Sequence, residues 1–214
     1  MKFSKGGRTG PDRRAALDQY RRRSGIYDLQ LAAFEPIRQL AIDSLDLRQG
    51  ETVLDLGCGT GLSLGRLHEA VGKAGQIIGI EQCPEMIEQA QERVRKHHYS
   101  NVHLLQAPAE EAEIDGQADA ALFHFTHDIL RRADALDHVL VHLRPGARVV
   151  ATGLCWAAPW ALPVNLFVWG AAMLSVSSFN GLDQPWSLLA GKLKDWRVRE
   201  LMFGGVFVAQ GRIG

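Results

Sequence analysis

The chain has 214 residues, of which 46% are hydrophobic and 22% charged, and its formal net charge at pH 7 is zero. This length and composition fit one compact domain that builds its own core and has room for a small cap. The balanced charge gives no reason to expect nucleic acid as a partner. Three cysteines without C-x-x-C spacing argue against a disulfide framework or a metal site. With no apolar leader at the start, we expect a cytoplasmic protein.

The charge is unevenly placed along the chain. Residues 1–23 carry eight Lys and Arg against two Asp. One interpretation of this arm is a solvated, partly disordered segment. The other is a helix attracted to anionic lipid or to an acidic partner. We predict that residues 1–48 form this basic arm and lid helices, and that residues 49–214 form the main domain.

Apolar runs alternate with amphipathic stretches from about residue 50 to residue 153. The alternation predicts a doubly wound α/β fold, in which a mainly parallel sheet is covered by helices on both faces. A glycine pair at 204–205, between two strand-like runs, predicts an antiparallel C-terminal hairpin that brings the sheet to seven strands. The expected strands are 52–56, 76–81, 102–106, 118–125, 147–153, 198–202 and 206–212. The expected helices are 62–71, one that begins at Pro84, 134–143 and 166–176.

One segment lacks charge altogether, since no Asp, Glu, Lys or Arg occurs from residue 149 to residue 182. Prolines at 159 and 163 interrupt it, and the uninterrupted apolar helix that follows is too short to span a bilayer. We predict an apolar cap insertion at about 155–195. It is interpreted as a lid over an apolar substrate, or as a dimer or membrane-surface contact.

The strongest motif is VLDLGCGTG at residues 53–61. Three glycines at a spacing of two follow a buried strand and open a helix, so the loop can bend sharply and let a ligand approach its backbone. The free N–H groups at the helix start favour an anion. Asp55 lies at the carboxyl end of its strand, where open α/β sheets bind ligands. Glu81 ends the next strand and can accept hydrogen bonds from both hydroxyls of a ribose.

Together with IEQCPEMIEQA (80–90) and LRPGARVV (143–150), this motif resembles the class I, Rossmann-like family of methyltransferases that use S-adenosylmethionine (SAM). A dinucleotide fingerprint would place its last glycine at position 62, which is Leu62. The resemblance covers residues 50–153 and implies SAM as cofactor and S-adenosylhomocysteine (SAH) as product. It implies cofactor contacts from Tyr27, Asp55, Gly57, Gly59, Thr60, Gly61, Glu81, Gln82, Met86, Glu110 and Phe123.

Three of these assignments have open alternatives. Tyr27 is either part of a lid that folds over the cofactor or a packing residue of a leading helix. Met86 is either a neighbour of the adenine or a core residue of its helix. Pro108 stands where the family often has an acidic residue that binds the adenine amine. Adenine recognition then falls to backbone groups or to Glu110.

The segment FHFTHD, at residues 123–128, follows the fourth predicted strand, whose end faces the transferred methyl group in the family's architecture. His124, His127 and Asp128 are therefore candidates to orient or deprotonate the methyl acceptor. The alternatives are that His127 and Asp128 support the following helix, and that methyl transfer needs only proximity and alignment.

Four of the five tryptophans fall in or beside the apolar insertion. Trp156, Trp186 and Asn165 are the predicted acceptor contacts, since aromatic rings can sandwich a planar molecule or hold an alkylated amine. The alternatives are that the tryptophans fill the cap and that Asn165 caps a helix.

We thus expect a methyltransferase for a small apolar or aromatic metabolite. A phospholipid or amine N-methyltransferase at the membrane surface is the alternative, and a non-catalytic SAM- or nucleotide-binding regulator is the alternative of another class. Besides the small-molecule acceptor, peripheral membrane contact and a homodimer are left open as partners.

Overall fold

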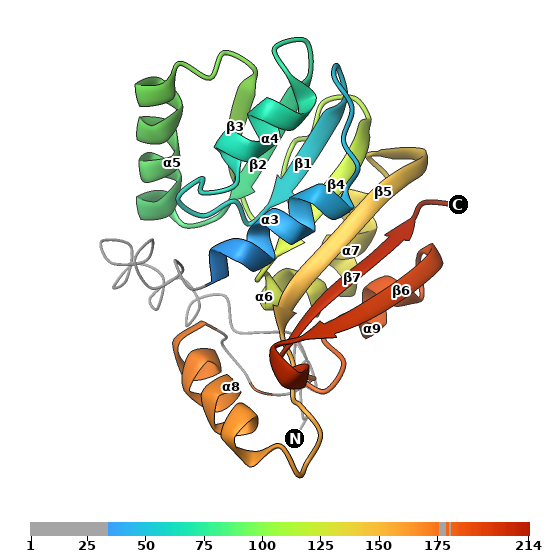
Figure 1. The fold of residues 1–214 in the computed structure, drawn as a ribbon. Coiled ribbons are helices and arrows are strands. Elements are labelled where there is room, and N and C mark those ends of the chain that lie inside the picture. The colour runs from blue at the N-terminus through green and yellow to red at the C-terminus, as the bar shows by residue number, and fades with distance from the viewer. Residues whose placement is uncertain (1–33, 176–178, 180) are drawn as a thin grey trace, which may run out of the picture.

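A computed structural model describes residues 34–175, 179 and 181–214 (Figure 1). Tyr27 and the basic arm lie outside the described residues. Seven strands form one sheet in the order β3-β2-β1-β4-β5-β7-β6. The strands are β1 (Thr52–Leu56), β2 (Gln76–Glu81), β3 (Val102–Gln106), β4 (Ala118–His124), β5 (Leu143–Leu154), β6 (Lys194–Leu201) and β7 (Val206–Arg212).

Strands β1 to β5 pair in parallel, whereas β7 runs antiparallel to both β5 and β6. The predicted α/β fold with an antiparallel C-terminal hairpin is confirmed. The chain first builds β1, β2 and β3 outward and then returns to place β4 on the other side of β1. Strand order therefore reverses between β1 and β4, and open α/β sheets bind their ligands at the carboxyl ends of the strands at such a switch point.

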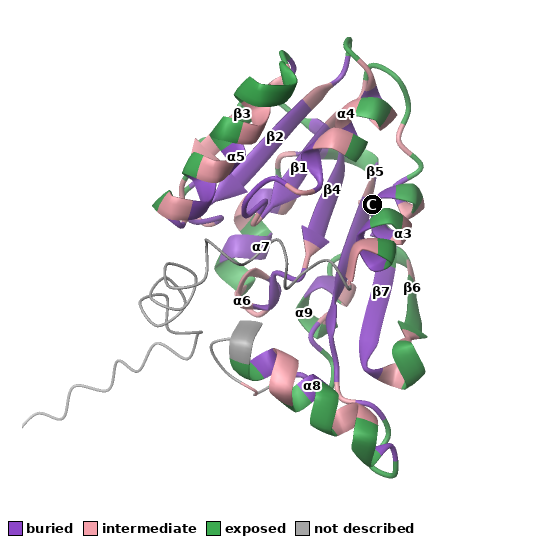
Figure 2. Cartoon of the chain, turned by 60° about the vertical axis from the view of Figure 1, so that its left-hand side comes forward, coloured by how far each residue is buried: buried purple, intermediate pink, exposed green. Residues whose placement is uncertain are grey.

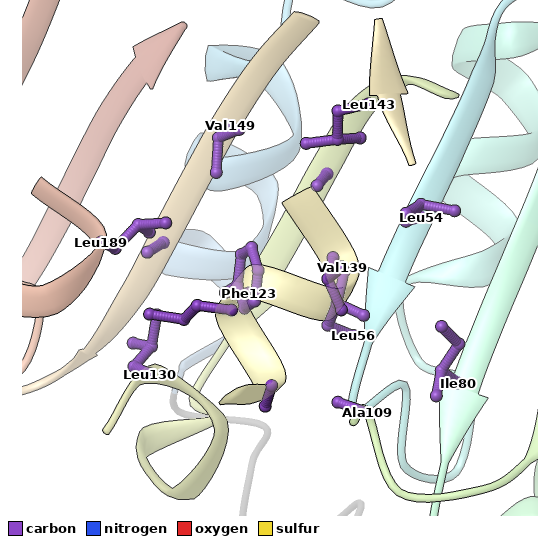
Figure 3. Packing of buried hydrophobic residues seen from close by; sticks show 14 of the residues in the cluster. Leu54, Leu56, Ile80, Ala109, Phe123, Leu130, Val139, Leu143, Val149 and Leu189 are labelled. Atoms are coloured by element: carbon purple, nitrogen blue, oxygen red, sulfur yellow. The ribbon is translucent and has the colours of Figure 1, made fainter. Parts of the chain in front are cut away.

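Helices cover both faces of the sheet. They are α3 (Glu35–Ser44), α4 (Leu64–Val71), α5 (Pro84–His97), α6 (His127–Leu130), α7 (Ala133–Leu140), α8 (Leu162–Ser175), α9 (Ser187–Ala190) and the 3-10 turn η2 (Met202–Gly204). Successive strand residues point to opposite faces. Val53 therefore belongs to the buried cluster that includes residues of α3, α4 and α8, whereas Leu54 belongs to the cluster that includes residues of α6, α7 and α9. Figure 3 shows Phe123, Leu130 and Leu189 in this second cluster.

Element bounds differ from the prediction mainly around prolines. The helix expected over 134–143 ends at Leu140, and β5 starts at Leu143 instead of residue 147. Pro145 and Gly146 thus lie inside the strand, where a register shift between Ala118 and Ala120 of β4 absorbs them. Likewise α8 begins at Leu162, because a proline is tolerated in the first turn of a helix.

The two edge strands are less buried than the central ones. β3 has the predicted bounds, and its residues are only partly buried or exposed. β6 begins at Lys194 rather than residue 198, and most of its residues are exposed, as on the other edge of the sheet. The central strands carry the buried residues (Figure 2).

Candidate cofactor and acceptor site

The glycine loop after β1 has positive φ angles, which residues other than glycine adopt only with strain. Gly57, Gly59 and Gly61 have φ values of 66°, 57° and 81°. Packing adds a second constraint, because a Cβ on Gly57 would lie 2.5 Å from Thr126 Cγ2, and one on Gly61 would lie 2.7 Å from Leu64 Cδ1. The loop therefore lies directly against the segment that follows β4.

Glu81, at the end of β2, holds this loop through hydrogen bonds. One carboxylate oxygen accepts from the Gly59 N–H at 3.1 Å, and the other accepts from the Cys83 N–H at 2.8 Å. Burial raises the pKa of Glu81, and these hydrogen bonds oppose the rise. Each carboxylate oxygen has more than one acceptor site, so both can still accept from ribose hydroxyls. The sequence indicated the ribose role but not the contact with the loop.

Asp55 is buried near the end of β1, and its Oδ2 has no hydrogen-bond partner among the described residues. Burial raises the pKa of its carboxyl to about 7; Arg38 lowers the pKa and Glu81 raises it. An unpaired buried oxygen is costly and calls for an explanation. A ligand ammonium would pair with this oxygen and favour the ionised carboxylate.

Arg38 is a site residue that sequence reasoning missed. It lies on α3, its side chain is only 3% exposed, and it forms an ion pair with Glu35. Its positive charge lowers the pKa values of Asp55 and of His124. One signal could have revealed it, because Arg38 shares a helical stripe with Ala41, Ile42 and Leu45, which are buried.

His124 ends β4, and its ring bridges to the neighbouring strand. Its Nδ1 lies 2.7 Å from the Thr152 hydroxyl oxygen on β5, whereas Nε2 is buried without a hydrogen-bond partner among the described residues. Burial, followed by the charge of Arg38, lowers the pKa of His124 to about 3. The imidazole is therefore neutral at physiological pH and has one nitrogen left for a ligand.

His127 and Asp128 open α6 next to it, and His127 is fully buried. Its Nε2 lies 2.9 Å from the Leu154 carbonyl, to which it donates a hydrogen bond, and the ring packs against Gly153. Burial also lowers the pKa of His127. These contacts favour the alternative in which His127 supports the helix. The catalytic roles of His127 and Asp128 stay predictions.

The remaining cofactor candidates lie in differing surroundings. Met86 and Phe123 are fully buried side chains, and Phe123 belongs to the core cluster of Figure 3. Glu110 forms an ion pair with Arg132 at 2.5 Å, so its carboxylate is already engaged. Thr60 lies buried within the glycine loop, and Gln82 directly follows Glu81.

The three predicted acceptor contacts do not converge. Trp156 stacks on Phe179 and packs on the α8 side of the sheet, whereas Trp186 packs on Phe207 in the opposite cluster. Asn165 lies within α8 and uses its amide to bind the preceding loop, accepting from the Ala157 N–H at 2.9 Å. That contact favours a structural role for Asn165.

An aromatic row that the sequence did not reveal leads away from His124. Phe125 lies edge-on to His124 with ring centroids 4.9 Å apart. Phe34 is the same distance from Phe125 and 6.3 Å from Phe167 of α8. The row therefore connects the end of β4 with α8.

The described part of the chain bears on two further kinds of site, a membrane span and a metal centre. No helix there is both long and apolar enough to cross a membrane. No group of three His, Cys, Asp or Glu side chains there is arranged to hold a metal ion.

The sheet order, the glycine loop and the carboxylates at the ends of β1 and β2 define a class I methyltransferase fold. Residues 47–166 match the family of methyltransferase domains, which is more than half of the chain. The chain therefore belongs to the SAM-dependent class I methyltransferases.

Similar proteins span several activities. An uncharacterized 37.1 kDa protein in transposon TN4556 of Streptomyces fradiae is 38% identical over 130 residues, which are 56% of this chain and 36% of that protein. Arsenite methyltransferase of Halobacterium salinarum is 32% identical over 122 residues, 55% of this chain and 30% of that enzyme. The chain thus matches about a third of the length of these relatives. The crystal structure of a SAM-dependent methyltransferase from Aquifex aeolicus superposes with a TM-score of 0.64 and 24% identity, over 89% of this chain and 98% of that one.

Proposed function

We propose that the protein transfers the methyl group of SAM to a small apolar or aromatic acceptor bound beside His124. The observation that carries this proposal is the arrangement at the switch point of the sheet. The buried carboxyl of Asp55 and the glycine loop lie at the end of β1, and the carboxylate of Glu81 lies at the end of β2. The neutral imidazole of His124 lies next to them at the end of β4.

The cofactor is assigned to residues whose chemistry matches its parts. Asp55 would bind the ammonium group of the methionine moiety, which favours the ionised form of its buried carboxyl. The buried cation Arg38 would bind the carboxylate of that moiety. Glu81 would accept hydrogen bonds from the ribose hydroxyls. When bound, SAM supplies a methyl group on a sulfonium, a leaving group that needs no further activation.

The acceptor is assigned to the aromatic row rather than to the tryptophans. Phe125 packs edge-on to His124, and Phe34 packs tilted against Phe125, which gives an apolar aromatic surface that suits a flat or apolar molecule. Trp156 packs on the same side of the sheet as Phe34 and stays a candidate contact. Trp186 packs on the opposite side, and the amide of Asn165 is already hydrogen-bonded to the backbone.

His124 is proposed to orient the acceptor through Nε2. A neutral imidazole can accept a hydrogen bond from an amine or hydroxyl and align its lone pair with the methyl group. Because the pKa of His124 is lowered to about 3, the ring is a weak base. The proposal therefore gives alignment, rather than proton removal, to this residue.

The test measures SAH formation by wild type and by His124→Phe with a panel of hydrophobic amines and phenols. SAH is then titrated into both proteins to measure its affinity. We expect His124→Phe to reduce kcat/KM about 5–150-fold, because a buried donor of the acceptor left without its partner costs about 1–3 kcal/mol, with SAH affinity within about twofold of wild type. Wild-type activity between pH 5 and 8 should show no titration of His124, because it is neutral throughout. Full activity in His124→Phe would overturn the proposed role.

Two other functions are separated by the same assays. A phospholipid or amine N-methyltransferase is favoured by the exposed apolar side of α8, and it would methylate lipid amines in vesicles in preference to soluble amines. A non-catalytic regulator would bind SAM and SAH but form no SAH with any acceptor or with cell extract.

A further inference from the structure

The short connection between β4 and α6 contains a strained residue, Phe125. Its φ of 58° lies in the left-handed region, which a bulky side chain occupies only at a cost in energy. The Phe125 N–H still donates to the Thr152 carbonyl of β5 at 2.9 Å, and the next residue, Thr126, is the N-cap of α6. Helix α6 therefore follows directly on the end of β4 (Figure 1). Strain of this kind is concentrated at functional sites.

The bend places the Thr126 side chain against the glycine loop. Thr126 is only 9% exposed. A Cβ on Gly57 would lie 2.5 Å from Thr126 Cγ2 and 3.6 Å from Thr126 Cβ, so the methyl group packs on the first glycine of the loop. Because the hydroxyl is bonded to the same Cβ, Oγ1 also lies beside the loop, close to where the chain leaves Asp55.

The Thr126 hydroxyl does not support the helix that it precedes. A threonine at an N-cap normally accepts a hydrogen bond from the N–H of the second or third helical residue. Thr126 makes no such side-chain bond, and the N–H of Ile129, the third residue of α6, donates to the Thr126 carbonyl at 3.1 Å instead. Among the described residues, Oγ1 is buried without a hydrogen-bond partner. A buried hydroxyl in this state is destabilising, and a bound ligand can remove the cost.

We propose that the Thr126 hydroxyl binds the amino-acid end of SAM by accepting a hydrogen bond from its ammonium group. This inference rests on the proposed placement of that ammonium at Asp55. Both Asp55 Oδ2 and Thr126 Oγ1 are buried and unpaired among the described residues, and Gly57 links them, since it follows Asp55 by two residues and contacts Thr126. An ammonium group has three N–H donors, so it can pair with a carboxylate oxygen and a hydroxyl together.

Two substitutions separate the hydroxyl from the methyl group of Thr126. Thr126→Val keeps the β-branched shape and the methyl group on Gly57 but removes the hydroxyl. In calorimetric titration it should weaken SAH binding about 10–150-fold, because a hydrogen bond to a charged group is lost. Thr126→Ser keeps the hydroxyl and removes the methyl group. It should recover the affinity to within about threefold of wild type.

The stability of the ligand-free protein provides a readout that a structural role would not give. Thr126→Val should raise the urea midpoint, because an apolar group replaces an unpaired buried hydroxyl. Thr126→Ser should lower the midpoint, because the methyl group packed on Gly57 is lost. The more stable variant is therefore expected to be the weaker binder. A purely structural role for Thr126 predicts the same order for stability and SAH affinity.

A truncated ligand locates the contact. 5′-Methylthioadenosine has the adenosine and the sulfur of SAH but lacks its amino-acid end, so Thr126→Val should change its affinity by less than about twofold. Equal weakening of both ligands would mean that the substitution disturbs the whole loop, and it would overturn the proposal. Unchanged SAH affinity in Thr126→Val, or no recovery in Thr126→Ser, would also overturn it. Wild type that binds neither ligand would instead contradict the proposed function, so the two failures are distinguishable.

Discussion

The substitution Asp55→Asn tests the cofactor assignment through the number of protons that the protein releases when it binds SAH. A carboxyl with a pKa of about 7 is about nine-tenths protonated at pH 6 and about one-tenth protonated at pH 8. If the ligand ammonium pairs with this carboxyl, binding ionises it and releases the proton. Wild type should therefore release about 0.9 proton per SAH from Asp55 at pH 6 and about 0.1 at pH 8.

The assay is calorimetric titration with SAH in buffers that differ in ionisation enthalpy, which yields the number of protons released. Asp55→Asn preserves the shape of the side chain and removes the titrating group, so subtracting its proton count cancels the contributions of other groups. Equal counts for wild type and variant at pH 6 would refute the reasoning. Asp55 would then be either ionised before binding or remote from the ammonium.

The same substitution changes how the free energy of unfolding depends on pH. The folded-state pKa of Asp55 is raised above its usual 3.8, so the folded state holds the proton more tightly and wild type loses stability as pH rises from about 4 to 7. The buried histidines have lowered pKa values and act in the opposite direction, but equally in both proteins. Urea unfolding should show the advantage of Asp55→Asn over wild type growing by about 2–3 kcal/mol between pH 5 and pH 8. Parallel pH profiles would contradict the burial argument.

Two further substitutions probe the glycine loop and the carboxylate that holds it. Glu81→Gln should weaken SAH binding about 10–150-fold in calorimetric titration, because a charged hydrogen-bond acceptor is lost, and an unchanged Kd would contradict the ribose assignment. Gly57→Ala should lower the free energy of unfolding in urea by about 2–4 kcal/mol, because its Cβ would meet Thr126 at 2.5 Å. Gly116→Ala is the control: φ there is 77° with nothing within 4 Å, so it should cost only the backbone strain, about 1 kcal/mol, and equal losses would argue against the clash.

The parallel part of the fold was predictable because its signals are local. Runs of apolar residues gave β1 and β2 their observed bounds, and the glycine loop marked the start of α4. Bounds failed where tertiary pairing overrides local preference. Pro145 looks like a helix stop, yet it lies in β5, because pairing with β4 and a register shift accommodate it.

The positions of the two candidate cofactor carboxylates were more predictable than those of the candidate acceptor contacts. Asp55 and Glu81 follow from strand ends and motif spacing, which a sequence displays directly. The aromatic row depends on how α3 and α8 pack, and that packing has no short-range signal. For Arg38 the apolar stripe of its own helix was the available signal. The tryptophans were predicted to converge on the acceptor because they are close in sequence, but the sheet separates Trp156 from Trp186.

Helix α3 packs against the part of the domain that carries the cofactor motifs. Ile37, Ala41 and Ile42 are part of the buried cluster, and Arg38 supplies the cationic charge beside Asp55. A recombinant fragment trimmed to start at the first motif would expose that apolar face and leave the Asp55 carboxyl without its compensating cation. We therefore expect the smallest unit that both folds and binds SAM to begin before Glu35, although the family match starts at residue 47.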